Sequence, residues 1–324
     1  MKKTRIYAVL LAAATSVFLG GCGKTAESFM KPYDITSQQS EFSFVGTSQQ
    51  SRASAFAADL CVANENVIPA EVTVTAETAS VYCVDDKTVL YAKNVHQRMN
   101  PASLTKIMTA LLTLESGRLD EEVTVTEEAM ITESGATLCH LKPGDKLTLR
   151  QLLNLSMVRS GNDAAAAIAV FLGGSLSNFN DMMNQRAKEL GATGTHFANP
   201  HGLTDEDHYT TAYDIYLMLK EALKYEEFLT IVGQGSYEVA YKDAEGKDKT
   251  NSFESTNRYV SGRVEAPEGI TVIGGKTGTT NAAGSCLALI TKGNSGKYYI
   301  SVILKADSTD MVFQEMNTLL SLEN

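Results

Sequence analysis

A serine and a lysine three residues apart are the pair in this sequence best suited to covalent chemistry. Ser103 and Lys106 stand at the start of an expected helix, because Pro101 suits a first turn and apolar residues follow at helical spacing. Side chains three positions apart lie about 60° apart around a helix, so the amine can reach the hydroxyl. Burial could lower the pKa of Lys106 enough for it to take the serine proton. Ser-x-x-Lys alone is more often a helix cap followed by a surface lysine.

A second group of polar residues follows an apolar helical face. Residues 149–159 and 163–172 both read as helices, and Gly161 permits a sharp turn between them. Such a corner could project Ser160 and Asn162 toward a cleft, where Ser160 relays a proton between Lys106 and a leaving amine. The Asn162 amide could hold Lys106 and bind a substrate backbone. The alternative is that Asn162 or its neighbour only caps the second helix.

A third group follows a strand-like run at residues 270–273. Glycines flank Lys276 and Thr277, which suggests close approach by an extended peptide at a sheet edge. Lys276 would then face a terminal carboxylate, with Thr277 donating a second hydrogen bond. A simple hairpin end is the alternative interpretation of Lys276-Thr277-Gly278.

In this order, the three motifs resemble the signature of class A β-lactamases and penicillin-binding proteins. The chain is more similar to the serine-type D-alanyl-D-alanine carboxypeptidases, the low-molecular-weight penicillin-binding proteins, over about residues 72–305. Residues 100–106 resemble the family's nucleophile segment, and residues 160–164 have its Ser-Gly-Asn form. Residues 195–203 and 208–214 also resemble family segments but carry no obvious chemistry. The spacing of His196, His201 and His208 fits no familiar metal site, so we expect no metal.

The resemblance implies a peptidoglycan stem pentapeptide as substrate, with no cofactor. Ser103 would form an acyl-enzyme, Lys106 would act as base, and Ser160 would pass the proton to the departing D-alanine. The backbone N–H groups of Ser103 and Thr279 would bind the oxyanion. β-Lactams would imitate the substrate and acylate Ser103. The substrate-binding residues would be Asn162, Lys276, Thr277, Gly278 and Thr279.

Other functions on the same motifs stay open. A β-lactamase needs a fast deacylating base, and no Glu-x-x-Leu-Asn segment lies between Ser160 and Lys276. An endopeptidase or transpeptidase would use the same acyl-enzyme. A penicillin-binding sensor would acylate without hydrolysis.

For the architecture we expect a mixed α/β (α+β) fold, the penicillin-recognising serine transpeptidase and β-lactamase-like fold. A five-stranded antiparallel sheet flanked by helices would include residues 79–85, 270–274, 285–291 and 298–305, and a final helix would span about 311–322. A mainly helical lobe would hold about residues 104–223, and the cleft between the two would hold Ser103. We expect the late strands to complete this sheet, with no further domain.

The N-terminal region reads as an export signal. A basic start precedes an apolar stretch that ends in a lipobox-like Leu19-Gly20-Gly21-Cys22, so we expect a lipoprotein signal at 1–22. An ordinary secretory signal is the alternative. A flexible tether would span 23–68, and the catalytic domain 69–324. The lipid on Cys22 would anchor the protein to the outer face of the bacterial membrane.

Charge and cysteine content complete these expectations. The net charge of −10 argues against nucleic acid as a partner. Besides Cys22, the chain has Cys61, Cys83, Cys139 and Cys286, with no Cys-x-x-Cys pair. We expect these four to be free and mostly buried thiols.

Overall fold

A five-stranded antiparallel sheet organises the protein. The structure, a computed structural model, describes residues 58–323. The strand order is β2-β1-β9-β8-β7, and each neighbouring pair is antiparallel. The predicted sheet is therefore confirmed, including its four expected segments. Its strands are β1 (Thr78–Cys83), β2 (Thr88–Lys93), β7 (Thr271–Thr280), β8 (Gly284–Lys292) and β9 (Tyr298–Ala306).

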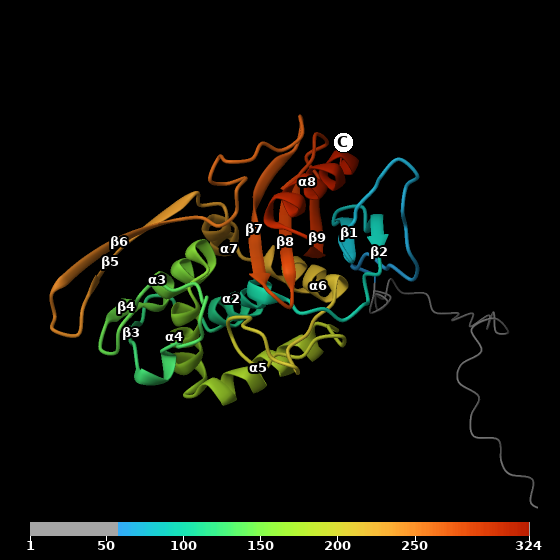
Figure 1. Ribbon diagram of the computed structural model, residues 1–324. Helices are drawn as coiled ribbons and strands as arrows, with labels where there is room; N and C mark the ends of the chain where they lie inside the picture. The colour runs from blue at the N-terminus through green and yellow to red at the C-terminus, as the bar shows by residue number, and fades with distance from the viewer. Residues whose placement is uncertain (1–57, 324) are drawn as a thin grey trace, which may run out of the picture. The chain divides into compact units, whose positions relative to one another are not determined.

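Helices cover both faces of this sheet, as Figure 1 shows, and both faces contribute to buried cores. Successive strand residues point to opposite faces, so in β8 Ala288 and Ile290 join one core while Leu287 and Leu289 join the other. Helix α8 (Thr309–Leu320) covers the second core. It begins two residues before the expected start at 311 because the Ser308 side chain caps it by accepting from the N–H of Met311.

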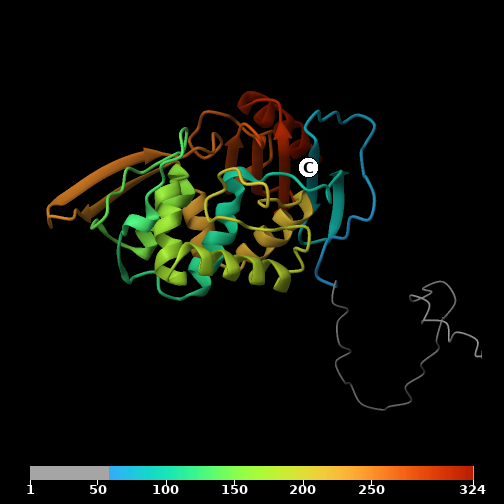
Figure 2. The same ribbon diagram turned by 60° about the horizontal axis from the view of Figure 1, so that its bottom comes forward.

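The other face of the sheet packs on a helical lobe. Helix α6 packs against β1 and β9, and α2 packs against α4, α5 and α6; Figure 2 shows these helices together on that side of the sheet. The predicted lobe is thus present. Its helices are α2 (Lys106–Glu115), α3 (Leu149–Asn154), α4 (Asn162–Gly173), α5 (Leu176–Glu189), α6 (Ala212–Ala222) and α7 (Glu226–Val232).

A second, four-stranded antiparallel sheet was not anticipated from the sequence. Its order is β3-β4-β5-β6, and the β5–β6 hairpin extends away from the helices in Figure 1. The strands β3 and β4 have only three residues each, and β6 alternates between exposed and half-buried side chains, so none of these three gives a strong apolar period. The strands are β3 (Glu122–Thr124), β4 (Lys146–Thr148), β5 (Ser236–Lys242) and β6 (Asp248–Glu254).

The folded part begins before residue 69. Cys61 is fully buried in the main core, and Val67 exchanges two backbone hydrogen bonds of 2.8 Å with Ala92. The last residues of the expected tether at 23–68 are therefore packed on the domain. The expected signal segment at 1–22, with Cys22, lies outside the described residues.

Two further observations concern the described residues as a whole. Cys61, Cys83, Cys139 and Cys286 are all buried and free of disulfides, as predicted. Between residues 58 and 323, no helix combines the length and apolar character that crossing a bilayer would require.

Candidate active site

Ser103 lies at the junction of the sheet and the helical lobe. It belongs to a short 3-10 turn, η1 (Ala102–Thr105), that leads directly into α2. The expected helix therefore begins with a tighter turn than an α-helix. Ala102, just before the serine, adopts a left-handed φ of 47°, which is uncommon for a residue with a Cβ atom. The Ser103 side chain is half-buried and faces a cleft.

Lys106 is completely buried beside this serine. Its Nζ lies 2.9 Å from Ser103 Oγ, 2.6 Å from Asn162 Oδ1 and 2.7 Å from the backbone oxygen of His201. Burial holds the pKa of Lys106 well below its ordinary value, and the nearby Lys276 lowers that pKa further. Both effects favour the neutral amine.

A neutral amine has two N–H donors and one lone pair. Asn162 Oδ1 and the His201 carbonyl oxygen can only accept, so each takes one N–H of Lys106. The lone pair is then left for the hydroxyl of Ser103 at 2.9 Å. The three distances together describe an amine placed to receive the serine proton.

The turn that carries Ser160 differs from the expected one. A π-helix, η3 (Leu155–Arg159), precedes it, and Ser160 itself adopts the left-handed φ of 68°. Gly161 has an ordinary φ of −61°, so its conformational freedom is not what makes the turn. A Cβ atom at Gly161 would lie 2.4 Å from the sulfur of Cys139, so close packing is what requires glycine here.

Asn162 and Asp163 fasten the start of α4 to the loop that follows residue 130. The N–H of Asn162 donates to the Thr137 oxygen at 2.8 Å. The buried carboxylate of Asp163 accepts from the N–H groups of Cys139 and Leu141 at 2.9 to 3.1 Å. Asp163 Oδ1 also accepts from the N–H of Ala164 in the first turn of α4 at 2.9 Å, so the alternative interpretation holds in part, whereas the Asn162 amide oxygen accepts from Lys106. Asn162 therefore binds Lys106, and Asp163 fixes the loop at Cys139 and Leu141 beside the cleft.

The third motif lies on β7, an edge strand of the main sheet. Lys276 is 1% exposed, and its Nζ donates to Ser160 Oγ and to the Thr277 backbone oxygen, each at 2.9 Å. Burial lowers the pKa of Lys276 to about 7. Thr277 Oγ1 donates to Thr256 Oγ1 at 2.6 Å. Ser160 thus contacts Lys276 rather than Lys106.

Gly278 brings this strand against the serine. A Cβ atom at Gly278 would lie 2.9 Å from the Ser103 nitrogen and 3.0 Å from Ala102 Cβ. Real Cβ atoms rarely approach so closely, so a larger residue would push the strand away from η1. The glycine of the motif is explained by this approach.

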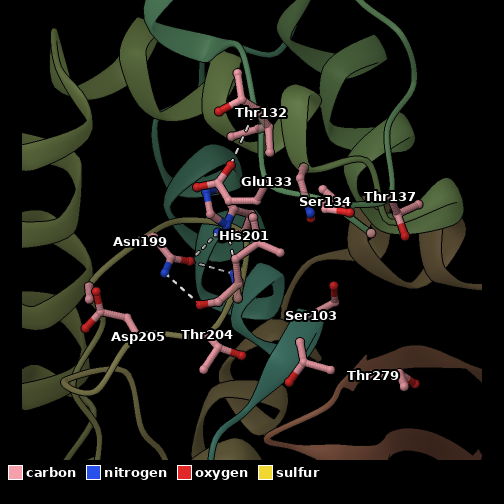
Figure 3. Close-up of a pocket in the computed structure, with 18 of the residues that line it drawn as sticks. Ser103, Thr132, Glu133, Ser134, Thr137, Asn199, His201, Thr204, Asp205 and Thr279 are labelled. Atoms are coloured by element: carbon pink, nitrogen blue, oxygen red, sulfur yellow. Dashed lines mark hydrogen bonds between the residues drawn. The ribbon is translucent and has the colours of Figure 1, made fainter.

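A cleft of about 730 Å³ opens at Ser103. In Figure 3, Thr132, Glu133, Ser134 and Thr137 lie along one side of Ser103, and Thr279 lies on the other. Asn162, His201 and Asn281 also line this cleft. A smaller hollow of about 170 Å³ shares Ser103 and Thr279 and is lined by Ser160, Thr256 and Thr277. All three motifs therefore border the space around the serine.

Sequence reasoning missed the part that residues 195–211 play. No chemistry was expected of this segment, yet the His201 carbonyl holds Lys106, and Gly202 packs directly on the Ala102 carbonyl. His208 is buried and hydrogen-bonded to Thr105. A backbone carbonyl has no side-chain signature, so only the similarity of this segment to a known family could have marked it.

The sequence is similar to known D-alanyl-D-alanine carboxypeptidases over most of the described residues. Residues 65–308 match the model of the D-alanyl-D-alanine carboxypeptidase family. The chain is 39% identical over 227 residues to D-alanyl-D-alanine carboxypeptidase DacF of Bacillus subtilis, which covers 68% of this chain and 55% of the relative. It is 33% identical over 243 residues to DacC of Escherichia coli, covering 72% and 57%. The chain thus spans little more than half the length of these curated relatives.

A solved structure matches over nearly its whole length. The crystal structure of the Streptomyces K15 DD-transpeptidase is similar with a TM-score of 0.72 and 29% identity, covering 78% of this chain and 97% of that one.

Proposed function

Because the chain belongs to the D-alanyl-D-alanine carboxypeptidase family, we propose that it is a serine D,D-carboxypeptidase that removes the terminal D-alanine from peptidoglycan stem pentapeptides. The observation that carries this proposal is the environment of Lys106, whose amine is buried, surrounded by two acceptors and 2.9 Å from Ser103 Oγ. The proposed mechanism uses side chains and backbone groups of this chain and calls for no cofactor.

Acylation begins with proton transfer from Ser103 to Lys106. The serine oxygen bonds to the carbonyl carbon between the two D-alanines, and negative charge develops on the carbonyl oxygen. The backbone N–H groups of Ser103 and Thr279 are the donors proposed for that oxyanion, and such preorganised donors often supply the largest catalytic term. The approach of Gly278 to the Ser103 nitrogen supports this role because it sets β7 beside the serine.

The leaving amine needs a proton, and Ser160 is the proposed route. Its Oγ accepts from Lys276, so its own hydroxyl hydrogen is free to point into the cleft toward the amine. The hydroxyl proton of Ser160 passes to the amine as the C–N bond to D-alanine breaks. The proton that Lys106 took from Ser103 then replaces it, a step for which Ser160 Oγ must turn from Lys276 to within hydrogen-bond distance of Lys106 Nζ. Lys276 is proposed to bind the D-alanine carboxylate, and Thr277 joins it once its hydroxyl turns away from Thr256 Oγ1. Asn162, Gly278 and Thr279 are proposed to border the peptide backbone.

Hydrolysis completes the cycle. A water molecule gives a proton to Lys106 and adds to the Ser103 ester, whose C–O bond then breaks as Lys106 returns that proton to Ser103 Oγ. The products are the free serine hydroxyl and a stem peptide shortened by one residue. A β-lactam would acylate the same serine. If an amine replaced water as the acceptor, the reaction would be transpeptidation, the activity for which the similar Streptomyces enzyme is named.

We also propose that the protein works outside the cell membrane, held by a lipid on Cys22 after removal of the signal segment. The lipobox-like sequence before Cys22 supports this proposal. Metabolic labelling with an alkyne fatty acid should mark the wild-type chain but not the Cys22→Ala variant. Equal labelling, or no labelling of either chain, would refute the lipid anchor.

The main test is release of D-alanine from a tripeptide that ends in D-Ala-D-Ala. We expect release by the full chain and none by Ser103→Ala, while Ser321→Ala, which changes an exposed serine at the end of α8, keeps full activity. Adding glycine as an acceptor distinguishes hydrolysis from transpeptidation. Absence of release with Ser103 still labelled by a fluorescent penicillin would overturn the carboxypeptidase proposal and leave transpeptidation, endopeptidation or sensing.

A further inference from the structure

The peptide unit between Ala102 and Ser103 carries the serine N–H at one end and the Ala102 carbonyl at the other. A trans peptide is planar, and its C=O and N–H point in opposite directions. Whatever holds the Ala102 oxygen therefore also sets the direction of the Ser103 N–H. That N–H lies in the first turn of a helix, where it has no intrahelical acceptor.

A chain of three hydrogen bonds ends on the Ala102 oxygen. The N–H of Ala198 donates to His208 Nδ1 at 3.0 Å, so the neutral ring carries its proton on Nε2. Nε2–H then donates to Thr105 Oγ1 at 2.7 Å. The Thr105 hydroxyl, having accepted that bond, donates to the Ala102 oxygen at 2.8 Å. Every donor and acceptor in the chain therefore has one definite role.

These three hydrogen bonds are held in place because the side chains that form them are buried. His208 is 1% exposed and Thr105 is fully buried. The ring of His208 packs edge-on against Phe197, with centroids 5.8 Å apart. Burial lowers the pKa of His208 to about 4, which keeps the ring neutral and its Nδ1 an acceptor at neutral pH.

Two glycines enclose the same peptide unit. A Cβ atom at Gly202 would lie 1.8 Å from the Ala102 oxygen, so the backbone at residue 202 packs directly against that oxygen. Gly278 makes the close approach at the nitrogen end. The left-handed φ of Ala102 is thus maintained by contacts on both sides of the peptide.

We propose that His208, acting through Thr105, is a positioning residue that aims the Ser103 N–H into the oxyanion site. The inference rests on the proposed acyl-transfer function. His208 does not touch the substrate, and its effect passes through one peptide unit to one catalytic donor. A histidine that served only to fill the core would need neither the defined tautomer nor the bond to Thr105.

Two nearly isosteric variants interrupt the chain at different points. His208→Phe keeps a ring against Phe197 and removes the bond to Thr105, while Thr105→Val keeps the side-chain volume and removes the hydroxyl. Loss of a whole oxyanion donor costs about 10²- to 10³-fold in kcat. A misdirected donor should cost less, so we expect a fall of about 10- to 100-fold in the kcat of D-alanine release. KM should change by about twofold or less, because ground-state binding is kept.

The two variants should act on one pathway. The double variant is therefore expected to be no slower than the slower single variant. Infrared spectra of the penicillin-acylated proteins should show the ester carbonyl stretch at higher frequency in both single variants, since a weaker hydrogen bond leaves a stronger C=O bond. His196→Phe changes a half-exposed histidine of the same segment and should leave both readouts unchanged.

Several results would overturn the proposal. Unchanged kcat and carbonyl frequency in folded His208→Phe would do so, as would multiplicative losses in the double variant. If His208→Phe fails to fold, Thr105→Val tests the proposal by the same kcat of D-alanine release and the same ester carbonyl frequency. Failure of the wild-type chain to release D-alanine would refute the proposed carboxypeptidase, whereas the infrared comparison on the penicillin acyl-enzyme would still test the positioning role.

Discussion

Burial of Lys276 should make the stability of the protein depend on pH in a predictable direction. Its pKa falls from an ordinary 10.5 to about 7 because the ammonium is completely desolvated in the folded chain. Between pH 7 and 10.5 the unfolded chain holds a proton on this lysine that the folded chain has lost. The free energy of unfolding therefore rises with pH through this window, and below pH 7 the full cost of burying the charge remains.

The size of the effect follows from that difference. The interval from 10.5 to about 7 spans about 3.5 pH units, and each unit corresponds to about 1.4 kcal/mol, which gives about 5 kcal/mol as the largest contribution. Over the accessible range from pH 7 to 9.5, the expected gain is about 3 kcal/mol.

Chemical denaturation of the wild type and of Lys276→Met from pH 6 to 9.5 measures this contribution. Methionine keeps a similar length without a charge. Because it also removes the effect of Lys276 on the pKa of Lys106, the comparison reports the Lys276 contribution together with that smaller change. We expect the free energy of unfolding of the wild type to rise relative to that of Lys276→Met as the pH increases. Parallel curves, or a shift in the opposite direction, would refute the argument that Lys276 is neutralised by burial.

Three further changes test other parts of the site and fold. Asn162→Ala removes the 2.6 Å acceptor of Lys106 Nζ and should slow acylation by a fluorescent penicillin by about 10²-fold; an unchanged rate would contradict the proposed orientation of the amine. Gly278→Ala places a Cβ atom 2.9 Å from the Ser103 nitrogen and should slow the same acylation by about 10-fold or more, so wild-type kinetics would show that β7 does not need this approach. Thr148→Ala removes the capping box of α3 and should lower the free energy of unfolding by about 1 kcal/mol with D-alanine release unchanged; a loss of activity at full stability would argue against a purely local cap.

The order and local setting of the three motifs were readable from the sequence. Ser103 and Lys106 are one turn apart in any helical geometry, and their 2.9 Å contact is a local consequence of that spacing. Four of the five strands of the main sheet were also readable, because buried strands give apolar runs such as residues 285–291. The edge strand β2, with exposed and half-buried residues at its start, was not named. The second sheet was not, since its three-residue strands and polar edge give no such run.

The chemical state of the site was decided by tertiary structure alone. The sequence led us to expect Asn162, 56 residues away, at the amine of Lys106, but nothing in it shows that the His201 carbonyl, 95 residues away, will take the other N–H. The same holds for the partner of Ser160, which proved to be Lys276 on the distant β7 strand. The sequence by itself determined which functional groups the protein possesses and which of them are local neighbours. Whether each group is protonated depends on desolvation and on partners from other elements, and both exist only once the chain has folded.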